Sequence, residues 1–408
     1  MNDDFKWRDV DKTSQIEHLK KGMAPPLDAG IFGMSLGESD CSVVLLEVPW
    51  EPTTSYGGGT SKTPEGIIEP SHQLDLYDTV LGPIYEKGIC FAEADDLSGR
   101  VIELWQEFES GEKVVLEDFS DVDSIPYCPP LFFHLSSVLK KKVEQVRKLE
   151  PDLIMSSFER FQVEDREGKL SSKENDLVKA IERETAEVNR WSVLLSEAVE
   201  KKALKLMQSG KKVGLVGGDH SSPYGLISAL KKLHKDISIL HIDAHFDYRK
   251  AYEGFTHSHA SIMYNARASL GPEAKFFHLA VRDFSIEELN FAQSQAHQTK
   301  FLESKEIRKK IVDGKFSDVL NGVSNFLGEK VYVSFDIDGL DPGLCPGTGT
   351  PVPGGLFYDE AILILEHLRH QGKNIVGFDL CEVAGHTSGS EFDYNVGARV
   401  LYKLCGLL

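Results

Sequence analysis

Four short apolar segments of this sequence end in polar or acidic clusters, and this pattern constrains the fold more than any other feature. These segments are Ser42–Leu46, Val213–Val216, Ile237–Ile242 and Val331–Phe335. Two similar segments, Phe276–Val281 and Asn374–Phe378, are further candidates. Short apolar runs without alternation are typical of strands that are buried on both faces of a parallel sheet.

Helical patterns lie between these segments. The longest runs from about residue 175 to 207, where apolar residues recur near helical spacing and Gly210 supplies a stop signal. Strands that alternate with helices form a mainly parallel sheet with helices on both of its faces. We therefore predict an α/β fold with three layers, α/β/α, around a mainly parallel central sheet.

The sequence divides unevenly along its length. Residues 1–40 are expected to form an N-terminal arm that packs on a neighbouring surface or is partly loose. Residues 41–408 are predicted to form a single domain with an insertion at about 97–173, because that stretch is rich in charge and contains several prolines. Within the insertion we expect a helix over 131–149 and a polar connector over 164–173.

Composition narrows the function classes. The net charge of the 408 residues is −19, and such a surface repels phosphate backbones, so we expect no nucleic-acid partner. Six scattered cysteines without a CxxC pair are expected to be buried thiols of a reducing cytosol. The N-terminus lacks a signal-peptide pattern, and no apolar run approaches the roughly 20 residues of a membrane helix. We expect a soluble, cytoplasmic protein without a membrane partner.

Acidic residues and histidines follow four of the six apolar segments. The clusters are Gly217–Ser221, Asp243–Asp247, Asp336–Pro342 and Asp379–Glu382. Because parallel α/β sheets place ligand sites at the C-terminal ends of their strands, we expect these clusters to meet at one rim of the sheet. Apart from Asp341, which lies farther along the third cluster, the rim would then hold two histidines and seven carboxylates, namely His220, His245, Asp219, Asp243, Asp247, Asp336, Asp338, Asp379 and Glu382.

This combination of side chains predicts a metal site. Seven carboxylates packed together are unfavourable unless cations neutralise them. Oxygen ligands with a minority of imidazoles suit Mn²⁺, with Ni²⁺, Co²⁺ or Fe²⁺ as alternatives. Six ligands are too many for one tetrahedral zinc but suit two ions that share bridging carboxylates. Two ions about 3.5–4 Å apart can lower the pKa of a shared water toward neutrality and create a hydroxide nucleophile.

Each motif taken alone has a simpler interpretation. An Asp-x-Asp at a strand end also fits a turn or a helix cap, and Gly-Gly-Asp-His also fits a tight loop with a hydrogen-bonded histidine. If the chain stays extended, however, Asp243, His245 and Asp247 share one face, and so do Asp336 and Asp338. The joint occurrence of the motifs, each behind an apolar segment, favours the metal site.

Together these motifs resemble the ureohydrolase family of arginase, agmatinase and their relatives. The resemblance rests on Gly217–Ser221, Asp243–Asp247, Ser334–Pro342, Gly377–Glu382 and the segment Pro49–Ile67. It covers about residues 41–95 and 176–408 and is only weakly informative about the substrate. It implies the arginase-like form of the predicted fold, a single catalytic domain over 41–408, two divalent metal ions per chain (Mn²⁺, or Ni²⁺), and a homo-oligomer, trimer or hexamer.

The resemblance also implies a ligand set. One ion would be held by His220, Asp243, Asp247 and Asp336. The other would be held by Asp243, His245, Asp336 and Asp338, so that Asp243 and Asp336 bridge the two ions. Asp247 would in addition orient the hydroxide that the ions share.

Two more residues match functional positions of the family. Glu382 matches the carboxylate that pairs with the substrate guanidinium, a planar cation suited to bidentate contact with a carboxylate. His259 falls where the family has a histidine that shuttles protons to the leaving amine. Here the chain departs from the pattern, because Ala260 replaces the usual glycine and His257 is a rival for the role.

The loop over 248–255 is expected at the mouth of the pocket. It lacks the Asn/Ser pattern with which arginases hold the amino-acid end of arginine, which disfavours arginase itself. Arg249 or Lys250 could meet a substrate carboxylate, or either could be an exposed surface charge.

The resemblance thus implies an amidinohydrolase that acts on a small cationic guanidino compound such as agmatine, a guanidino acid or guanidine. The products would be urea and an amine or ammonia. Alternatives are a formimino-substrate hydrolase, a deacetylase-like amidohydrolase on the same fold, and a non-catalytic paralogue. The deacetylase type uses one zinc and adjacent paired histidines, whereas this chain has a His-x-His and a full two-ion ligand set. A non-catalytic paralogue would be expected to lack a ligand, and none is missing.

Overall fold

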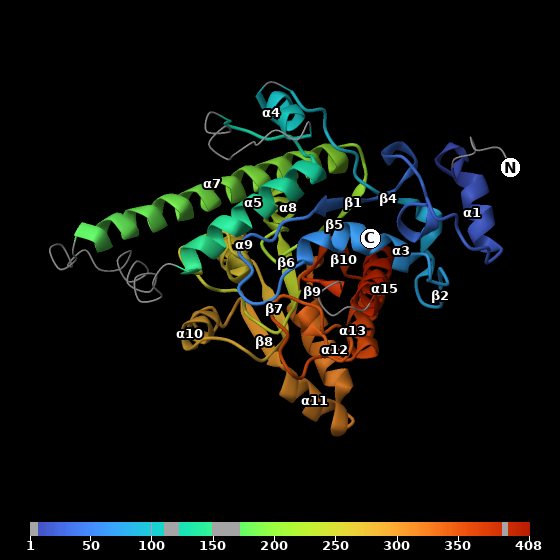
Figure 1. The fold of residues 1–408 in the computed structure, drawn as a ribbon. Helices are drawn as coiled ribbons and strands as arrows, with labels where there is room; N and C mark the ends of the chain where they lie inside the picture. The colour runs from blue at the N-terminus through green and yellow to red at the C-terminus, as the bar shows by residue number, and fades with distance from the viewer. Residues whose placement is uncertain (1–6, 99, 110–121, 149–171, 386–390) are drawn as a thin grey trace.

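The computed structural model describes residues 7–98, 100–109, 122–148, 172–385 and 391–408. Parallel strands form its central sheet in the order β4-β1-β5-β10-β9-β6-β7-β8 (Figure 1). Their bounds are β1 Val43–Val48, β4 Ile89–Phe91, β5 Lys212–Gly217, β6 Ile237–Ile242, β7 Phe276–Val281, β8 Thr299–Glu303, β9 Lys330–Asp336 and β10 Asn374–Cys381. All six predicted strands are present, and β4 and β8 extend the sheet at its two edges. A separate antiparallel pair joins β2 (Tyr77–Asp78) and β3 (Gly82–Pro83).

Helices cover both faces of the sheet, which confirms the predicted three layers (Figure 1). The helices on one face are α5 Pro129–Lys148, α7 Ser172–Gln208, α8 Tyr224–Leu233, α9 Ile262–Leu270 and α10 Ile286–Ser294. The helices on the other face are α3 Ile68–Ser71, α11 Ser304–Val312, α12 Phe316–Phe326, α13 Tyr358–His370 and α15 Phe392–Leu407. The remaining helices are α1 Lys12–Lys20, α2 Thr63–Gly66 and α4 Arg100–Glu109. Among the described residues, none of these helices is long and apolar enough to cross a bilayer.

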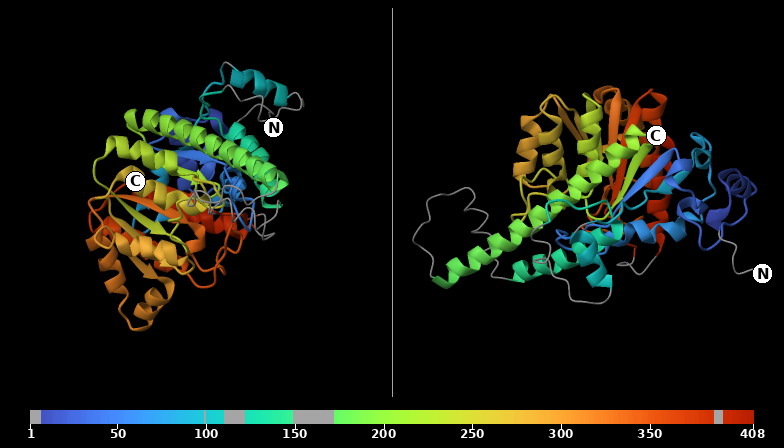
Figure 2. Two further views of the ribbon diagram at one scale, coloured as in Figure 1. Left: turned by 90° about the vertical axis from the view of Figure 1, so that its left-hand side faces the viewer. Right: turned by 90° about the horizontal axis from the view of Figure 1, so that it is seen from above.

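The long helix α7 follows the predicted spacing. Its buried residues Val188, Trp191, Leu195 and Val199 recur every three or four positions and pack into the core. The helix ends at Gln208, and Gly210 just beyond it has φ +86°, a left-handed conformation that glycine adopts without steric cost. Figure 2 shows that the N-terminal part of α7 extends well beyond the sheet.

Helix α5 lies within the predicted insertion, yet it packs directly on the sheet. It lies beside α7 and contacts β1. One stripe of α5 is completely buried in the core that it shares with those elements, namely Leu131, Phe132, Leu135, Leu139 and Val143. The expected connector at 164–173 lies almost wholly outside the described residues, and the division into an arm, a domain and an insertion stays a prediction.

The described part of the predicted N-terminal arm packs on the chain's own core. Trp7, Ile31, Phe32 and Met34 are buried, the last three in the cluster that also contains residues of α15. The six cysteines are buried free thiols, as expected.

The packing of α5 yields a stability prediction. Leu135→Ala should lower the free energy of unfolding by about 2–5 kcal/mol, because it leaves a cavity at a completely buried position. Phe133→Ala is the matched control on the exposed side of the same helix and should cost less than about 1 kcal/mol. Denaturant unfolding followed by circular dichroism measures both. Equal losses in the two variants would contradict a role for α5 in the core.

Candidate metal centre

The four predicted clusters lie at the C-terminal ends of β5, β10, β9 and β6, which are consecutive neighbours in the sheet. This order brings together side chains that are up to 163 positions apart in the chain, from Asp219 to Glu382. All seven carboxylates are at most 5% exposed, and their ion-pair partners within 4 Å include His220, His241 and His245. Burial of this many acidic groups requires compensating positive charge.

The first group of donor atoms converges on the ring of His220. Its Nδ1 lies 3.0 Å from Oδ2 of Asp243, 3.1 Å from Oδ2 of Asp247 and 3.2 Å from Oδ2 of Asp336. A single ring N–H cannot serve three carboxylate oxygens at once. Four donor atoms that converge in this way could instead hold one cation.

The second group shares a carboxylate with the first. Nδ1 of His245 lies 3.3 Å from Oδ1 of Asp243 and 3.2 Å from Oδ2 of Asp338. The other oxygen of Asp338 accepts a hydrogen bond of 2.9 Å from the backbone N–H of Ala244, which fixes its direction. Asp243 therefore presents one oxygen to each group, as a bridging ligand must. The donor set fits divalent cations.

Tight turns, and not the extended segments considered above, bring these side chains together. Asp247 has φ +55°, a left-handed conformation that non-glycine residues rarely adopt. Asp336 ends β9 and caps the 3-10 helix η8 (Ile337–Gly339), because its side chain accepts the backbone N–H of Asp338 at 2.9 Å. The turns therefore direct residues two positions apart toward the same point.

The pKa values reflect the crowding of charge. Burial raises the pKa of Asp336 well above its ordinary range, and repulsion from Asp338 and Asp243 adds to this effect. Burial and repulsion from Asp243 raise the pKa of Asp247 to about 6. The pKa of His245 is well above its ordinary range, because Asp338 and Asp243 outweigh the opposing effect of burial. The cluster attracts protons or metal cations strongly.

Glu382 lies just behind the ligand set. Its Oε1 accepts a hydrogen bond of 3.0 Å from the backbone N–H of His220, and its Oε2 is buried without a hydrogen-bond partner among the described residues. It has φ +66°, and burial raises its pKa well above the ordinary range, with repulsion from Asp219 adding to it. A strained backbone and an unpaired buried oxygen are costly features that are typical of functional sites.

A pocket of about 320 Å³ opens onto the two groups. His245, Asp247 and His259 line it together with Arg249 and Tyr252. Of the two rival histidines, only His259 lines this pocket. The ring of His257 packs against Tyr224 instead, with 5.5 Å between the ring centroids.

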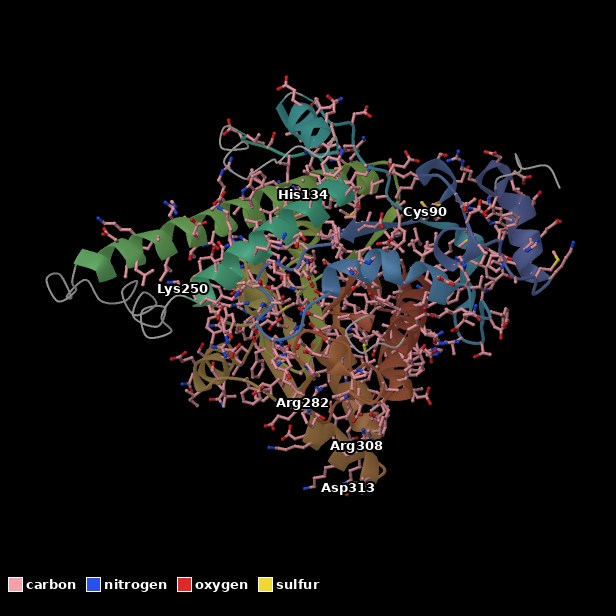
Figure 3. The ribbon with its side chains drawn as sticks, viewed as in Figure 1. Cys90, His134, Lys250, Arg282, Arg308 and Asp313 are labelled. Carbon is pink, nitrogen blue, oxygen red and sulfur yellow. The ribbon has the colours of Figure 1, made fainter. Side chains whose placement is uncertain are left out.

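The mouth of the pocket is polar and carries charges of both signs. Arg249 lies 3.6 Å from Glu288 and stacks over the ring of Tyr252 at 5.2 Å. Asp283 also lines the mouth. Lys250, labelled in Figure 3, is exposed and does not line the pocket.

Sequence reasoning missed the residues that hold His259. The hydroxyl oxygen of Thr53 lies 3.3 Å from Nδ1 of His259 and accepts the backbone N–H of the same residue at 3.2 Å. Arg147 of α5 in turn donates hydrogen bonds to the carbonyl oxygens of Thr53 and Thr54 and to the carboxylate of Glu253. The sequence around Arg147 is rich in charge and did not indicate that this residue holds the Thr53 loop, because the residues that Arg147 contacts are about a hundred positions away.

The role of Arg282 was also not indicated by the sequence around it. Its guanidinium, labelled in Figure 3, donates to the carbonyl oxygens of Asp338 and Leu340 at 2.6 and 3.2 Å, and to that of Val352 at 2.9 Å. It thereby ties the loop that carries Asp338 to the end of β7.

Comparison with known proteins identifies the family of the chain. The sequence model of the Arginase family matches residues 138–406, about two thirds of the chain. The chain belongs to the arginase family. An N(1)-aminopropylagmatine ureohydrolase of Thermus thermophilus is 31% identical over 209 residues, which cover 51% of this chain and 67% of that protein. An agmatinase of Halalkalibacterium halodurans is 34% identical over 196 residues, 48% of this chain and 63% of its own length.

A third relative is similar over a longer stretch. The N(1)-aminopropylagmatine ureohydrolase of a Synechocystis species is 24% identical over 375 residues, 90% of this chain and 89% of that protein. These relatives are ureohydrolases, and this arginase-family chain is a hydrolase of the same class, which acts on C–N bonds in linear amidines.

Solved structures share the fold. The agmatine ureohydrolase of Thermoplasma volcanium superposes with a TM-score of 0.58 at 19% identity, over 91% of each chain. The arginase of Medicago truncatula superposes with a TM-score of 0.54 at 18% identity, over 97% of this chain and 93% of that one. The arginase-like form of the α/β/α fold is thereby confirmed.

Crowding of the buried carboxylates predicts that metal ions stabilise the protein. Addition of Mn²⁺ to chelator-treated protein should raise the thermal unfolding midpoint, because a ligand that binds only the folded state stabilises it by about 2.7 kcal/mol at a hundred times its Kd. Scanning calorimetry with increasing Mn²⁺ measures the effect, with an equal ionic strength of KCl as the control. An unchanged midpoint would show that the cluster binds no metal.

Proposed function

We propose that the protein is a binuclear metal-dependent amidinohydrolase that cleaves the guanidinium C–N bond of a small guanidino compound. The products would be urea and an amine or ammonia. The observation that carries this proposal is the position of Asp243, which presents Oδ2 to the group around His220 and Oδ1 to His245 beside an open pocket. One shared carboxylate between two donor groups is the pattern of a two-ion site.

The proposed ligands follow the two groups. His220, Asp247 and Asp336 would hold one ion with Asp243, and His245 and Asp338 the other, with Asp336 as a second bridge. Two divalent ions, Mn²⁺ or Ni²⁺, would lower the pKa of a water molecule toward neutrality and so supply the nucleophile. A ligand set rich in carboxylates with two imidazoles suits these metals.

Glu382 is proposed to bind the guanidinium group. The unpaired Oε2 of this buried carboxylate is available for a charge-assisted hydrogen bond with a planar cation. A side chain at Gly349 would bring a Cβ atom within 2.6 Å of this oxygen, so glycine at 349 leaves space beside it. The neighbouring Thr350 lines the pocket, so this space lies next to the pocket wall.

Asp247 and His259 are proposed to handle protons. Asp247 lies both in the first donor group and on the pocket wall, so it can accept a hydrogen bond from the attacking water and orient it. Burial and the neighbouring charges of His245 and Arg147 lower the pKa of His259 to about 3, so its imidazole is neutral at pH 7. An imidazole with so low a pKa binds a proton only weakly, so we propose that it relays a proton to the more basic leaving nitrogen and does not retain it.

A direct test is the release of urea from a panel of guanidino compounds. The panel consists of arginine, agmatine, guanidinobutyrate, guanidinopropionate and guanidine, each with Mn²⁺ and with Ni²⁺. We expect urea from at least one of the last four and little from arginine. Absence of urea from every compound, in protein that binds two metal ions per chain, would refute the proposed reaction.

Two substitutions separate metal binding from substrate binding. Glu382→Gln should keep both ions and lose most of the turnover, because it removes the charge proposed to pair with the guanidinium without touching a ligand. Asp338→Ala, the matched loss of a ligand carboxylate, should lose metal and activity together. Metal content by plasma mass spectrometry and kcat by urea release measure both. Full activity of the Glu382 variant would refute its role.

A further inference from the structure

A row of buried polar side chains leads from the sheet interior to Asp243. His241 on β6 and His278 on β7 are paired across the two strands, and their Nδ1 atoms are 2.8 Å apart. Nε2 of His278 lies 2.8 Å from the hydroxyl of Tyr248, and Nε2 of His241 lies 2.8 Å from Oδ2 of Asp243. Tyr248 is 3% exposed, and neither imidazole has any exposed surface.

The contacts along this row differ in kind. The contacts of His278 with His241 and with the hydroxyl of Tyr248 are hydrogen bonds, whose donors depend on the tautomers of the rings. The contact between His241 and Asp243 is an ion-pair contact at 2.8 Å, and Nε2 of His241 has no hydrogen-bond partner among the described residues. The hydrogen-bonded row therefore ends in a close contact with Oδ2 of Asp243.

The row also continues on the other side of Tyr248. Its hydroxyl has hydrogen bonds with Thr299 and Arg267. Nη2 of Arg267 lies 2.8 Å from the hydroxyl of Thr299, and this guanidinium is buried. The phenol is therefore held in place from both sides.

The row has no evident role in holding the fold. Its neighbours on the same strands, such as Leu240, Ile242 and Leu279, are apolar, and apolar residues at 241 and 278 would avoid the desolvation of two imidazoles. Side chains that contact metal ligands from behind fix the orientation of those ligands. The orientation of Asp243 matters in particular, because its Oδ2 contacts His220 and its Oδ1 contacts His245.

We propose that Tyr248, His278 and His241, which are joined by hydrogen bonds, form a chain of positioning residues whose contact with Asp243 holds that carboxylate in its bridging orientation. The chain does not touch the substrate. It rests on the ligand set of the proposed function, and it assigns a role to three residues outside that set.

The experiment measures metal affinity and not turnover. Tyr248→Phe removes only the hydroxyl that is hydrogen-bonded to His278, and His278→Phe removes the link to His241. We expect the Kd for Mn²⁺, from competition with a fluorescent chelator, to rise about 10-fold in the first variant and about 10–100-fold in the second.

Phe276→Leu is the matched control. Phe276 lies on β7 two positions before His278, and its ring contacts Tyr248 at 6.4 Å between centroids. This variant should lower the unfolding midpoint of the metal-free protein as His278→Phe does, but leave the Kd for Mn²⁺ unchanged. If the His278→Phe variant fails to fold, the milder Tyr248→Phe variant still tests the proposal.

The outcomes are distinguishable. The proposal would be overturned if both Tyr248→Phe and His278→Phe bound Mn²⁺ with wild-type affinity. It would also be overturned if Phe276→Leu lost as much Mn²⁺ affinity as these two variants. If no guanidino compound yields urea while the affinities differ as expected, the proposed reaction fails and the chain stands.

Discussion

Repulsion between buried carboxylates is the constraint on which the rest of this structure depends. Seven of them lie at the ends of four adjacent strands and are almost completely buried. Burial in a medium of low dielectric constant strengthens their mutual repulsion, so the site is stable only with positive charge between them. The histidines supply part of this charge, and the convergence of three oxygens on His220 points to cations for the remainder.

The fold holds the buried carboxylates at defined positions, and this requires strained backbone conformations. Asp247 and Glu382 both have a positive φ, which for such residues costs of order 1–3 kcal/mol each. Close packing of backbone around Gly218 fixes the loop before His220, since a Cβ atom there would lie 2.1 Å from the carbonyl oxygen of Trp50. Contacts from distant elements, such as those of Arg147 with the Thr53 loop, keep the turns in place. Backbone strain of this kind persists only where the surrounding contacts hold the strained conformation in place.

Local sequence patterns predicted the strands and the residues that follow them, because both depend on neighbours within a few positions. The run at 213–216 is apolar throughout, the run at 331–335 is apolar except for Ser334, and an acidic residue follows each within three positions. The partners of those residues were less accessible. His241 lies inside an apolar run, and only the register that pairs it with His278 reveals a polar row. Arg147 lies in a charge-rich stretch, and its partners belong to loops far away in the sequence.

The proposed site would separate the reaction from the selection of the substrate. The buried donor groups are acidic, so they would attract the guanidinium end of any candidate substrate. The pocket that opens onto them is lined by charges of both signs, namely Arg249 with its ion-pair partner Glu288, and Asp283. A carboxylate at the other end of the substrate would be attracted by Arg249 and repelled by Asp283, and an ammonium would be repelled by Arg249 and attracted by Asp283. The position of that second charged group within the pocket would therefore decide which substrates bind.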